Sequence, residues 1–312
     1  MDKTKKNWLL VIAVSFVVIA SSATFIFNSS QNPKRISYQL PDTEIEEKSW
    51  KEIMNSDALI DQFKILNTGS VKVPLDGLLN TEKLESEHSL KEHLWVDVYV
   101  FMFHHQEKGW YIIETGLDST FQDNGNIKGL LTDNYIIASK QRKGQNIASQ
   151  LRSEGKKVNG IFFTHLHGDH TAGLPELDSS LPKYVGKDEK VLDIPLLYQH
   201  KHFTDASELN ELDWSKGVTK PPFEHVMDFF GDGSLLGIHT PGHSKGHLSY
   251  LLMSQEGPIL LTGDASHTKY GFENSIEPGW VDYRKAAENS LDQLIRFHQM
   301  FPNVKIIYGH EQ

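Results

Sequence analysis

Histidine and aspartate side chains cluster in one short stretch of this sequence, FFTHLHGDHTAG at 162–173. Residues two apart in an extended or turning segment point the same way, so His165 and His167 can share one metal ion. Asp169 and His170 lie beyond a glycine turn and can be aimed at a second position nearby. Because imidazole and carboxylate groups are metal ligands, this spacing predicts metal chemistry.

Three more metal-capable side chains follow later in the chain, each just after a short apolar run. His243 follows LLGIHT, Asp264 follows PILLTG, and His310 follows VKIIYG. A glycine comes directly before each of them, and glycine allows the sharp turn that aims the next side chain back over the end of a strand. Loops at the ends of rigid strands commonly carry functional groups. We therefore expect these three side chains to join the first cluster.

The seven side chains divide between two ions with one carboxylate between them. The chain has no cysteine, so thiolate ligands, disulfides and a cysteine nucleophile are excluded. Nitrogen and oxygen ligands suit zinc, and also iron, manganese or cobalt. Two zinc ions are favoured because zinc accepts variable coordination. We predict His165, His167 and His243 for one ion, Asp169, His170 and His310 for the other, and Asp264 as the bridge, with His239 and His247 close enough to orient the ligands.

Short strands and a few helices must position these residues. The runs at 95–103 and 110–115 are rich in β-branched and aromatic residues and predict a hairpin. The stretch FKILNTGSVKVPL at 63–75 predicts strands joined by a glycine turn. Apolar residues at helical spacing predict helices over 144–155 and 282–301. This mixture indicates an α/β or α+β domain.

The first 27 residues indicate a membrane segment. Trp8–Phe27 is an uncharged run of 20 residues. As a helix, it would span about 30 Å, the thickness of the hydrocarbon core of a bilayer. Three lysines among the first six residues favour a cytoplasmic N-terminus. We expect a signal anchor over 1–27, which would hold a single-pass protein in the cell membrane with its catalytic domain outside the cytoplasm. The alternative is a signal peptide cleaved near Ser21-Ser22-Ala23, which would give a secreted protein.

The rest of the chain divides into a polar linker over 28–60, ending in a short helix, and a catalytic domain over 61–312. With 38% hydrophobic residues, the 312-residue chain can bury a substantial core. A formal net charge of -10 argues against nucleic-acid binding, which usually requires a basic surface. The sequence carries no indication of oligomeric state.

The metal motifs resemble those of a known family. THLHGDH resembles the HxHxDH signature of the metallo-β-lactamase-fold hydrolases, and TPGHSKGH, LLTGDAS and IIYGH match its remaining ligand motifs in order. WYIIETGLD resembles the strand that ends in a D-T-G turn, with Glu114 in place of Asp. The resemblance covers roughly 63–312. It implies a four-layer αββα sandwich with a two-metal site at one edge.

Within that family, TPGHSKGHLS, LLTGDASHTK and YGHEQ are most similar to the N-acyl-homoserine lactonase branch. That branch has a Tyr three residues after the bridging Asp, which contacts the substrate carbonyl; here the position is His267, and Tyr270 lies nearby. The resemblance implies that a metal-bridging hydroxide opens an ester or lactone of a small-molecule substrate. Asp169 would orient this nucleophile, and His267 or Tyr270 would stabilise the oxyanion.

Other hydrolases on the same site are the alternatives: a β-lactamase-like amidase, a phosphodiesterase or a thioesterase. A phosphodiesterase should carry Lys or Arg near the metals, and only Lys245 and Lys269 are close to the motifs. A metal-binding sensor or a redox enzyme is a further class. Redox members of the family usually have Glu in place of the second His, which here is His167. The loop over 196–214 supplies aromatic residues that could form an apolar substrate wall.

Overall fold

The structure is a computed structural model that describes residues 33–84, 92–123, 125–193, 196–204 and 207–311. The expected membrane segment over 1–27 lies outside these described residues. Within the described ranges, no helix combines the length and the apolar character that crossing a bilayer requires.

Most strands belong to one large sheet that folds into two halves. The strands of the first half are β1 (Lys34–Tyr38), β2 (Ile60–Pro74), β3 (His93–His105), β4 (Gly109–Ile113), β6 (Ala138–Lys140), β7 (Val158–Phe162), β8 (Lys183–Gly186) and β10 (Glu208–Leu212). The strands of the second half are β11 (Val218–Lys220), β12 (Phe223–Asp228), β13 (Leu235–His239), β14 (Leu248–Ser254), β15 (Gly257–Leu261) and β16 (Lys305–Ile307).

The helices and one small strand pair complete the described chain. The strand pair is β5 (Ile127–Lys128) with β9 (Gln199–His200). The α-helices are α2 (Trp50–Met54), α3 (Leu75–Leu78), α4 (Ile147–Glu154), α5 (Gly168–Thr171), α6 (Lys269–Glu273) and α7 (Arg284–Met300).

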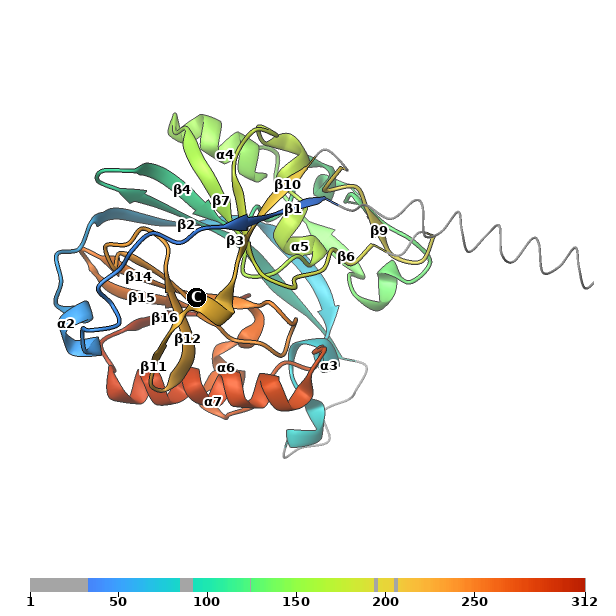
Figure 1. The fold of residues 1–312 in the computed structure, drawn as a ribbon. Helices are drawn as coiled ribbons and strands as arrows, with labels where there is room; N and C mark the ends of the chain where they lie inside the picture. Colours follow the sequence, from blue (N-terminus) through green and yellow to red (C-terminus); the bar gives the residue numbers. More distant parts are fainter. Residues whose placement is uncertain (1–32, 85–91, 124, 194–195, 205–206, 312) are drawn as a thin grey trace, which may run out of the picture.

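The strand order explains how two halves arise from one sheet. The first half runs β1-β10-β8-β7-β4-β3-β2, with β6 beside β2, and the second runs β14-β13-β12-β11, with β15 and β16 on the other side of β14. A single register pair, Ile60 of β2 with Ser254 of β14, joins them. So narrow a junction lets the two halves turn toward each other and pack face to face (Figure 1).

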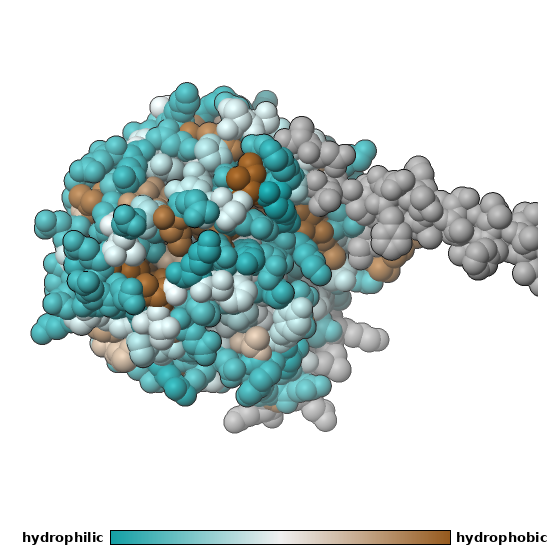
Figure 2. All heavy atoms as spheres, in the orientation of Figure 1, coloured by the Kyte–Doolittle hydropathy of each residue, from teal (hydrophilic) through white to brown (hydrophobic). Residues whose placement is uncertain are grey.

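Three apolar clusters give the molecule its four layers. The central cluster packs β3 against β14 and includes Phe103, Phe162 and Tyr250. An outer cluster packs Ile147 of α4 against the first half. The other outer cluster packs α7, through Leu294, against the second half. Figure 1 shows α4 and α7 on opposite outer sides of the strands, and the face seen in Figure 2 is mainly hydrophilic. The expected αββα arrangement is therefore present.

The structure also confirms the main expected elements. β3 and β4 form the antiparallel hairpin. The two helices predicted over 144–155 and 282–301 are α4 and α7, and α4 ends at Gly155 with φ 64°. One expectation is wrong: the glycine in the stretch 63–75 makes no turn. β2 continues through Gly69, where the register against β3 shifts, so this glycine marks a β-bulge.

Part of the segment expected as a polar linker, 28–60, is built into the domain. β1 pairs in parallel with β10 at the outer edge of the sheet, and Tyr38 stacks on Phe229 with 5.1 Å between ring centroids. Trp50 and Ile53 of α2, the expected short helix, are buried. A linker is therefore the wrong description from β1 onward, because a few apolar side chains among polar ones suffice to anchor an edge strand and a short helix.

Candidate metal centre

The predicted ligands meet at one edge of the sandwich because they follow the ends of four strands. His165 follows β7, and His243 follows β13. Asp264 lies in a short 3₁₀ turn just after β15, and His310 comes soon after β16, which runs parallel to β15. The two segments stay in register because the backbone N–H of His310 donates to the carbonyl of His267, 3.0 Å away.

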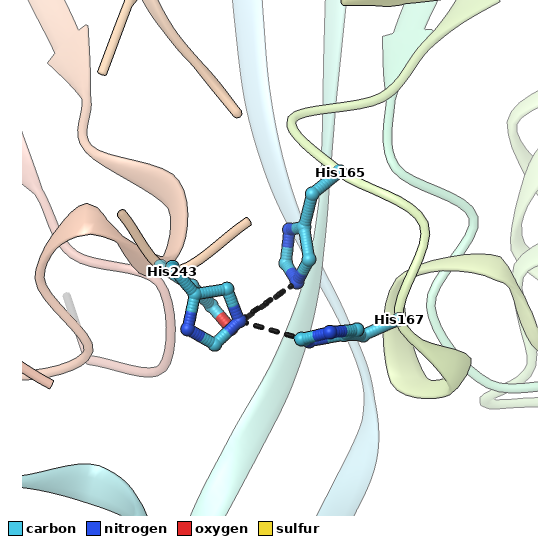
Figure 3. Close-up of side chains that lie close together, drawn as sticks. His165, His167 and His243 are labelled. Atoms are coloured by element: carbon cyan, nitrogen blue, oxygen red, sulfur yellow. Dashed lines mark hydrogen bonds and ion pairs between the residues drawn. The ribbon is translucent and has the colours of Figure 1, made fainter. Parts of the chain in front are cut away.

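Three imidazoles, His165, His167 and His243, form the first set. Figure 3 shows the first two coming from one loop and His243 from the facing side, with their rings converging. Nε2 of His243 lies 3.1 Å from Nε2 of His165 and 2.9 Å from Nδ1 of His167. Oδ2 of Asp264 lies 3.3 Å from Nε2 of His243. Four ligand atoms thus surround one point.

Asp169, His170 and His310 form the second set. Oδ2 of Asp169 lies 3.7 Å from Nε2 of His170 and 3.5 Å from Nε2 of His310. Asp264 reaches this set too, with Oδ2 3.3 Å from His170 and Oδ1 3.6 Å from His310. A single buried carboxylate therefore touches both sets, the position that a bridging ligand requires.

Two glycines allow these close approaches. Gly263 has φ 54°, a conformation that residues with a side chain rarely adopt, and it turns Asp264 back toward the strand ends. Gly309 is needed for space: a Cβ atom there would lie 2.4 Å from Oδ1 of Asp264. Any side chain at this position would push the carboxylate away from His310.

Backbone carbonyls fix three of the imidazoles from behind. Nδ1 of His243 bonds to the carbonyl of Trp280 at 2.8 Å, and Nδ1 of His310 to that of Asp97 at 2.9 Å. His267 does the same with Leu78 at 2.9 Å. A carbonyl only accepts, so each Nδ1 carries the proton and each Nε2 faces the centre with a lone pair when the ring is neutral. This is the usual arrangement behind metal-binding histidines.

His247, which the sequence placed beside the site, holds the backbone of the bridging Asp264. Its Nε2 accepts a hydrogen bond of 3.0 Å from the backbone N–H of Asp264. Its Nδ1 contacts Thr240, and burial lowers the pKa of the ring to about 3. His239 stacks on Trp214, with 4.0 Å between ring centroids, and its Nε2 lies 3.0 Å from the backbone carbonyl of Lys245, two residues after His243.

Two buried carboxylates outside the ligand sets hold the ligand loops. Glu114 has φ 69°, an unusual conformation for a non-glycine residue. Its Oε1 accepts from the backbone N–H of Thr164 and lies 3.3 Å from Nδ1 of His170. Glu114 therefore links the end of β7 to the second set, which gives the unusual Glu in the predicted turn a structural role.

The other buried carboxylate, Glu189, ties two ligand loops together. It accepts hydrogen bonds from the hydroxyl of Ser244, from the backbone N–H of Gly246 at 2.9 Å, and from the backbone N–H of Leu166. These donors flank the ligands of the first set. Burial raises the pKa of Glu189 to about 7 although the three hydrogen bonds oppose the shift.

The two sets differ in their electrostatics. Burial, the largest effect, lowers the pKa of all three imidazoles of the first set. Burial acts in the same direction on His170 and His310, but the carboxylates of Asp264 and Asp169 outweigh it and raise the pKa of both rings. Burial alone would raise the pKa of Asp264, yet the surrounding imidazoles, led by His170, hold it well below its usual value.

Unsatisfied buried atoms give a second reason, independent of residue spacing, why these side chains fit a metal ion. Among the described residues, Nε2 of His170 and Oδ1 of Asp264 are buried without a hydrogen-bond partner. Buried polar atoms in proteins are nearly always satisfied. The first set also brings ring nitrogens within 3.1 Å of one another. A cation at each position would satisfy these atoms.

Tyr270, one of the two residues expected to stabilise an oxyanion, lies elsewhere. It belongs to α6, its side chain is 53% exposed, and it borders a separate hollow with Leu79 and Glu92. Thr268 caps α6 by accepting from the N–H of Gly271, so the chain enters the helix and turns Tyr270 away from the ligands. Tyr270 therefore lies apart from the ligand sets, and its contact with a bound substrate stays a prediction.

His267, by contrast, is buried at the centre. Its Nε2 lies 3.1 Å from Oδ2 of Asp264, and its ring centroid is 5.5 Å from that of His310. These three side chains form a third group with metal-ligand spacing.

A cavity of about 410 Å³ opens onto the ligands. We call its polar end the floor: His167, Asp169, His243, Asp264, His267 and His310. We call its apolar lining the apolar wall: Val73, Leu78, Val96, Tyr135, Ile136, Leu192, Tyr198, Trp280 and Val281. No lysine or arginine is among the described residues that line it.

Comparison with known families agrees with this architecture. The family model described as "Metallo-beta-lactamase superfamily" matches residues 94–310, which is more than half of the chain. The chain belongs to the metallo-β-lactamase superfamily. The matched region includes every ligand motif and strands of both halves of the sheet, but not β1 and β2.

Individual members of the superfamily are more distant. An N-acyl homoserine lactonase from a Bacillus species is 25% identical over 215 residues, covering 66% of this chain and 78% of the relative. A gamma-lactamase from Fusarium pseudograminearum is 30% identical over 238 residues, covering 56% of this chain and 58% of the relative. A solved structure of an N-acyl homoserine lactone hydrolase, with the product N-hexanoyl-L-homoserine bound at its catalytic metal centre, superposes with a TM-score of 0.62 and 20% identity, over 80% of this chain and 93% of the other. That likeness shows the shared fold.

Sequence reasoning missed several residues of this superfamily member's site. Glu189 and Trp280 lie outside every recognised motif, and neither is marked by its neighbours. Tyr198 belongs to the aromatic loop over 196–214, whereas Tyr135 lies outside that loop and carries no signal in the sequence. Only Glu114 carried a signal, as the one departure from the turn pattern that precedes the ligands.

Proposed function

We propose that the protein is a metal-dependent hydrolase that opens a lactone or related ester carrying an apolar group. One observation carries the proposal: two ligand sets that share Asp264 form the floor of a cavity whose wall is apolar. The floor offers the chemistry of hydrolysis, and the wall offers a place for an alkyl or acyl chain. Lactonases among the similar proteins support the same substrate class.

The first and second sets would each hold one ion, with Asp264 between them. Two such ions, preferably zinc, would supply Lewis acidity and a water of lowered pKa when bound. Backbone carbonyls of the chain hold His243, His267 and His310 in place. This preorganisation matters because ligands already held in place cost little reorganisation during the reaction.

Asp169 is positioned to handle the proton of the attacking water. Its side chain lies partly open to the cavity, and Oδ2 is 3.5 Å from Nε2 of His310. Its other oxygen can take a proton from the nucleophile and return it to the leaving alkoxide. General-base groups of this kind act within hydrogen-bond reach of the proton they accept.

The cavity chemistry favours a neutral ester over a phosphodiester. A phosphate would need cationic side chains, and none of the described residues that line the cavity is Lys or Arg. Lys245 and Lys269, the two candidates from the sequence, pair with Asp188 and Glu273 instead. Asp282 adds a further carboxylate to the lining, which would repel an anionic substrate.

A substrate panel tests the proposal. The full chain, purified in detergent and loaded with zinc, is assayed with N-acyl homoserine lactones of rising acyl length, simple γ-lactones, a γ-lactam, a β-lactam, a thioester and a phosphodiester. We expect lactones to be opened, with kcat/KM rising with acyl length until the cavity is filled. Hydrolysis of the phosphodiester alone, or of the lactam alone, would contradict the proposal.

We also propose that the N-terminal apolar run anchors the catalytic domain at the outer face of the cell membrane. The support is the sequence of residues 1–27: an uncharged run long enough to cross a bilayer, preceded by lysines. Membrane fractionation, together with mass spectrometry of the N-terminus, tests it. An intact N-terminus in the membrane fraction, with protease access from outside, is the expected result. A mature protein that begins near Ala23 would instead identify a cleaved signal peptide.

A further inference from the structure

The Nε2 atom of His267 has the surroundings of a metal ligand rather than those of a hydrogen-bond donor to a substrate. Its Nδ1 lies 2.9 Å from the carbonyl oxygen of Leu78, the last residue of α3, where helix carbonyls have no partner within the helix. The carbonyl can only accept, so the proton is on Nδ1. In the neutral ring, Nε2 then has a lone pair and cannot donate to a substrate oxygen.

The lone pair of Nε2 points at another acceptor. Oδ2 of Asp264 lies 3.1 Å away, and two acceptors at that distance repel each other unless a cation or a proton lies between them. His243 and His310 show the same pattern, with Nδ1 on a backbone carbonyl and Nε2 directed at Asp264. His267 therefore shares its geometry with two residues of the ligand sets.

We propose that His267 is a metal ligand of the ion that His310 and Asp264 hold. This inference rests on the proposed metal centre and deepens it. Ligand atoms of these three residues lie within 4.8 Å of one another. The ion would then be bound by an additional imidazole where the similar lactonase branch has a tyrosine that contacts the substrate.

Two consequences follow for the chemistry of the centre. A position with imidazoles from both His267 and His310 is richer in nitrogen than one with His310 alone, which favours zinc, cobalt, nickel or copper over manganese and magnesium. The site also gives up the side-chain donor that the similar lactonase branch has at this position. We expect the protein to discriminate among carbonyl substrates chiefly through its apolar wall.

A measurement of zinc affinity tests the proposal without relying on turnover. The full chain, stripped with a chelator, is titrated with Zn²⁺ against a chromophoric chelator. The wild type should take up two equivalents. His267→Ala and His267→Gln should bind one of them more weakly, by at least the ~10- to 100-fold that loss of an outer partner of a ligand costs. His104→Ala is the matched control, since His104 pairs with Asp61 on β2 and borders neither ligand set.

Nitrogen NMR on the wild type removes any dependence on the folding of a variant. With ¹⁵N-labelled histidine, the Nε2 resonance that is missing in His267→Gln should shift on addition of Zn²⁺ to the position of a metal-bound nitrogen. A resonance of a protonated Nε2 that persists in the zinc-loaded protein would overturn the proposal and assign His267 as an imidazolium paired with Asp264.

The two proposals fail separately. Two equivalents bound with unchanged affinity in both His267 variants, while kcat falls, would overturn the ligand role and leave the hydrolase intact, with His267 touching the substrate. Weakened zinc binding in these variants, in a protein that opens no lactone or ester, would uphold the ligand role and overturn the proposed function.

Discussion

The floor and the apolar wall of the cavity are built in different ways. Backbone carbonyls hold three imidazoles of the floor from behind, and His247 holds the backbone of Asp264. The wall consists of side chains from five separate segments, and its aromatic members contact one another edge to face, as Tyr135 does with both Tyr198 and Trp280.

This difference assigns the reaction to the floor and the choice of substrate to the apolar wall. Polar groups in the floor have directional partners, so a small displacement of one ligand is felt by its neighbours. Apolar contacts in the wall are non-directional and roughly proportional to area. The wall can therefore change shape while the floor keeps its geometry. Substitutions in the two regions should have effects of different size and kind.

The largest effect is expected from Asp264→Ala. Removing the carboxylate shared by both sets leaves neither ion with its full ligand set, so kcat should fall by on the order of 10³-fold or more, since each ion contributes several kcal/mol to such reactions. Zinc content after dialysis and kcat for the best lactone are the measurements. Asp264→Asn, which keeps the shape, is the matched variant. Full turnover with either variant would contradict the expected difference between the floor and the apolar wall.

Trp280→Ala should affect selection more than chemistry. The indole packs against Gly77, where a Cβ would lie 2.5 Å from the ring, and forms part of the wall. The backbone carbonyl that holds His243 is retained in the variant. Loss of a large apolar side chain removes ~1.5–3 kcal/mol of contact, so kcat/KM for long-chain substrates should fall by roughly 10- to 100-fold. Short-chain substrates should lose much less, and zinc content should stay at the wild-type level.

Equal losses for short and long chains would show that Trp280 acts through His243 rather than through the wall. Trp280→Phe, which keeps an aromatic ring, should fall between the wild type and Trp280→Ala.

Glu189→Gln should alter the pH dependence of stability. Burial raises the pKa of the folded state to about 7 from 4.5, so the folded protein keeps a proton that the unfolded chain releases. Stability is therefore greatest below about 4.5 and is lost as pH rises through 7, by at most about 3 kcal/mol. The glutamine variant has no such group. Between pH 5 and pH 8, the stability of Glu189→Gln should therefore increase relative to that of the wild type. Denaturant titration, which gives the free energy of unfolding of both proteins, measures this change.

A parallel pH profile for both proteins would mean that Glu189 is ionised in the folded state throughout. Because Glu189 joins the loops that carry His165 and His243, zinc affinity of the first set should fall in Glu189→Ala more than in Glu189→Gln.

The smallest effect is expected from Tyr270→Phe. The side chain is 53% exposed and borders another hollow, so kcat/KM should stay within about twofold, whereas loss of an oxyanion donor typically costs ~10²-fold. A large decrease would place Tyr270 back in the reaction and require movement of α6.

The floor could be predicted from the sequence because its residues are set by strand ends. Once β7, β13, β15 and β16 are recognised as apolar runs, the polar residues just after them must meet at one edge. The wall could not, since Tyr135, Tyr198 and Trp280 come from loops whose paths depend on tertiary packing. Tyr270 shows the limit of spacing arguments: six residues from Asp264 in sequence, it is turned away by the cap of a new helix.

The N-terminal part of the domain was missed for a different reason. β1 is short and polar on its outer side, and its partner β10 lies more than 170 residues further along. Local composition carries no information about such a distant pairing. A membrane segment, by contrast, is predicted from composition alone, and that prediction stays open to the fractionation experiment.

The close contact at Gly309 has a consequence for how this enzyme could evolve. A Cβ there would meet the bridging carboxylate at 2.4 Å, so even alanine should be rejected at a position that binds neither metal nor substrate. In a saturation mutagenesis library, we expect active variants to keep glycine at position 309 and to accept many residues at positions of the apolar wall. New substrate ranges would therefore arise through substitutions in the apolar wall, while the residues of the floor stay nearly unchanged.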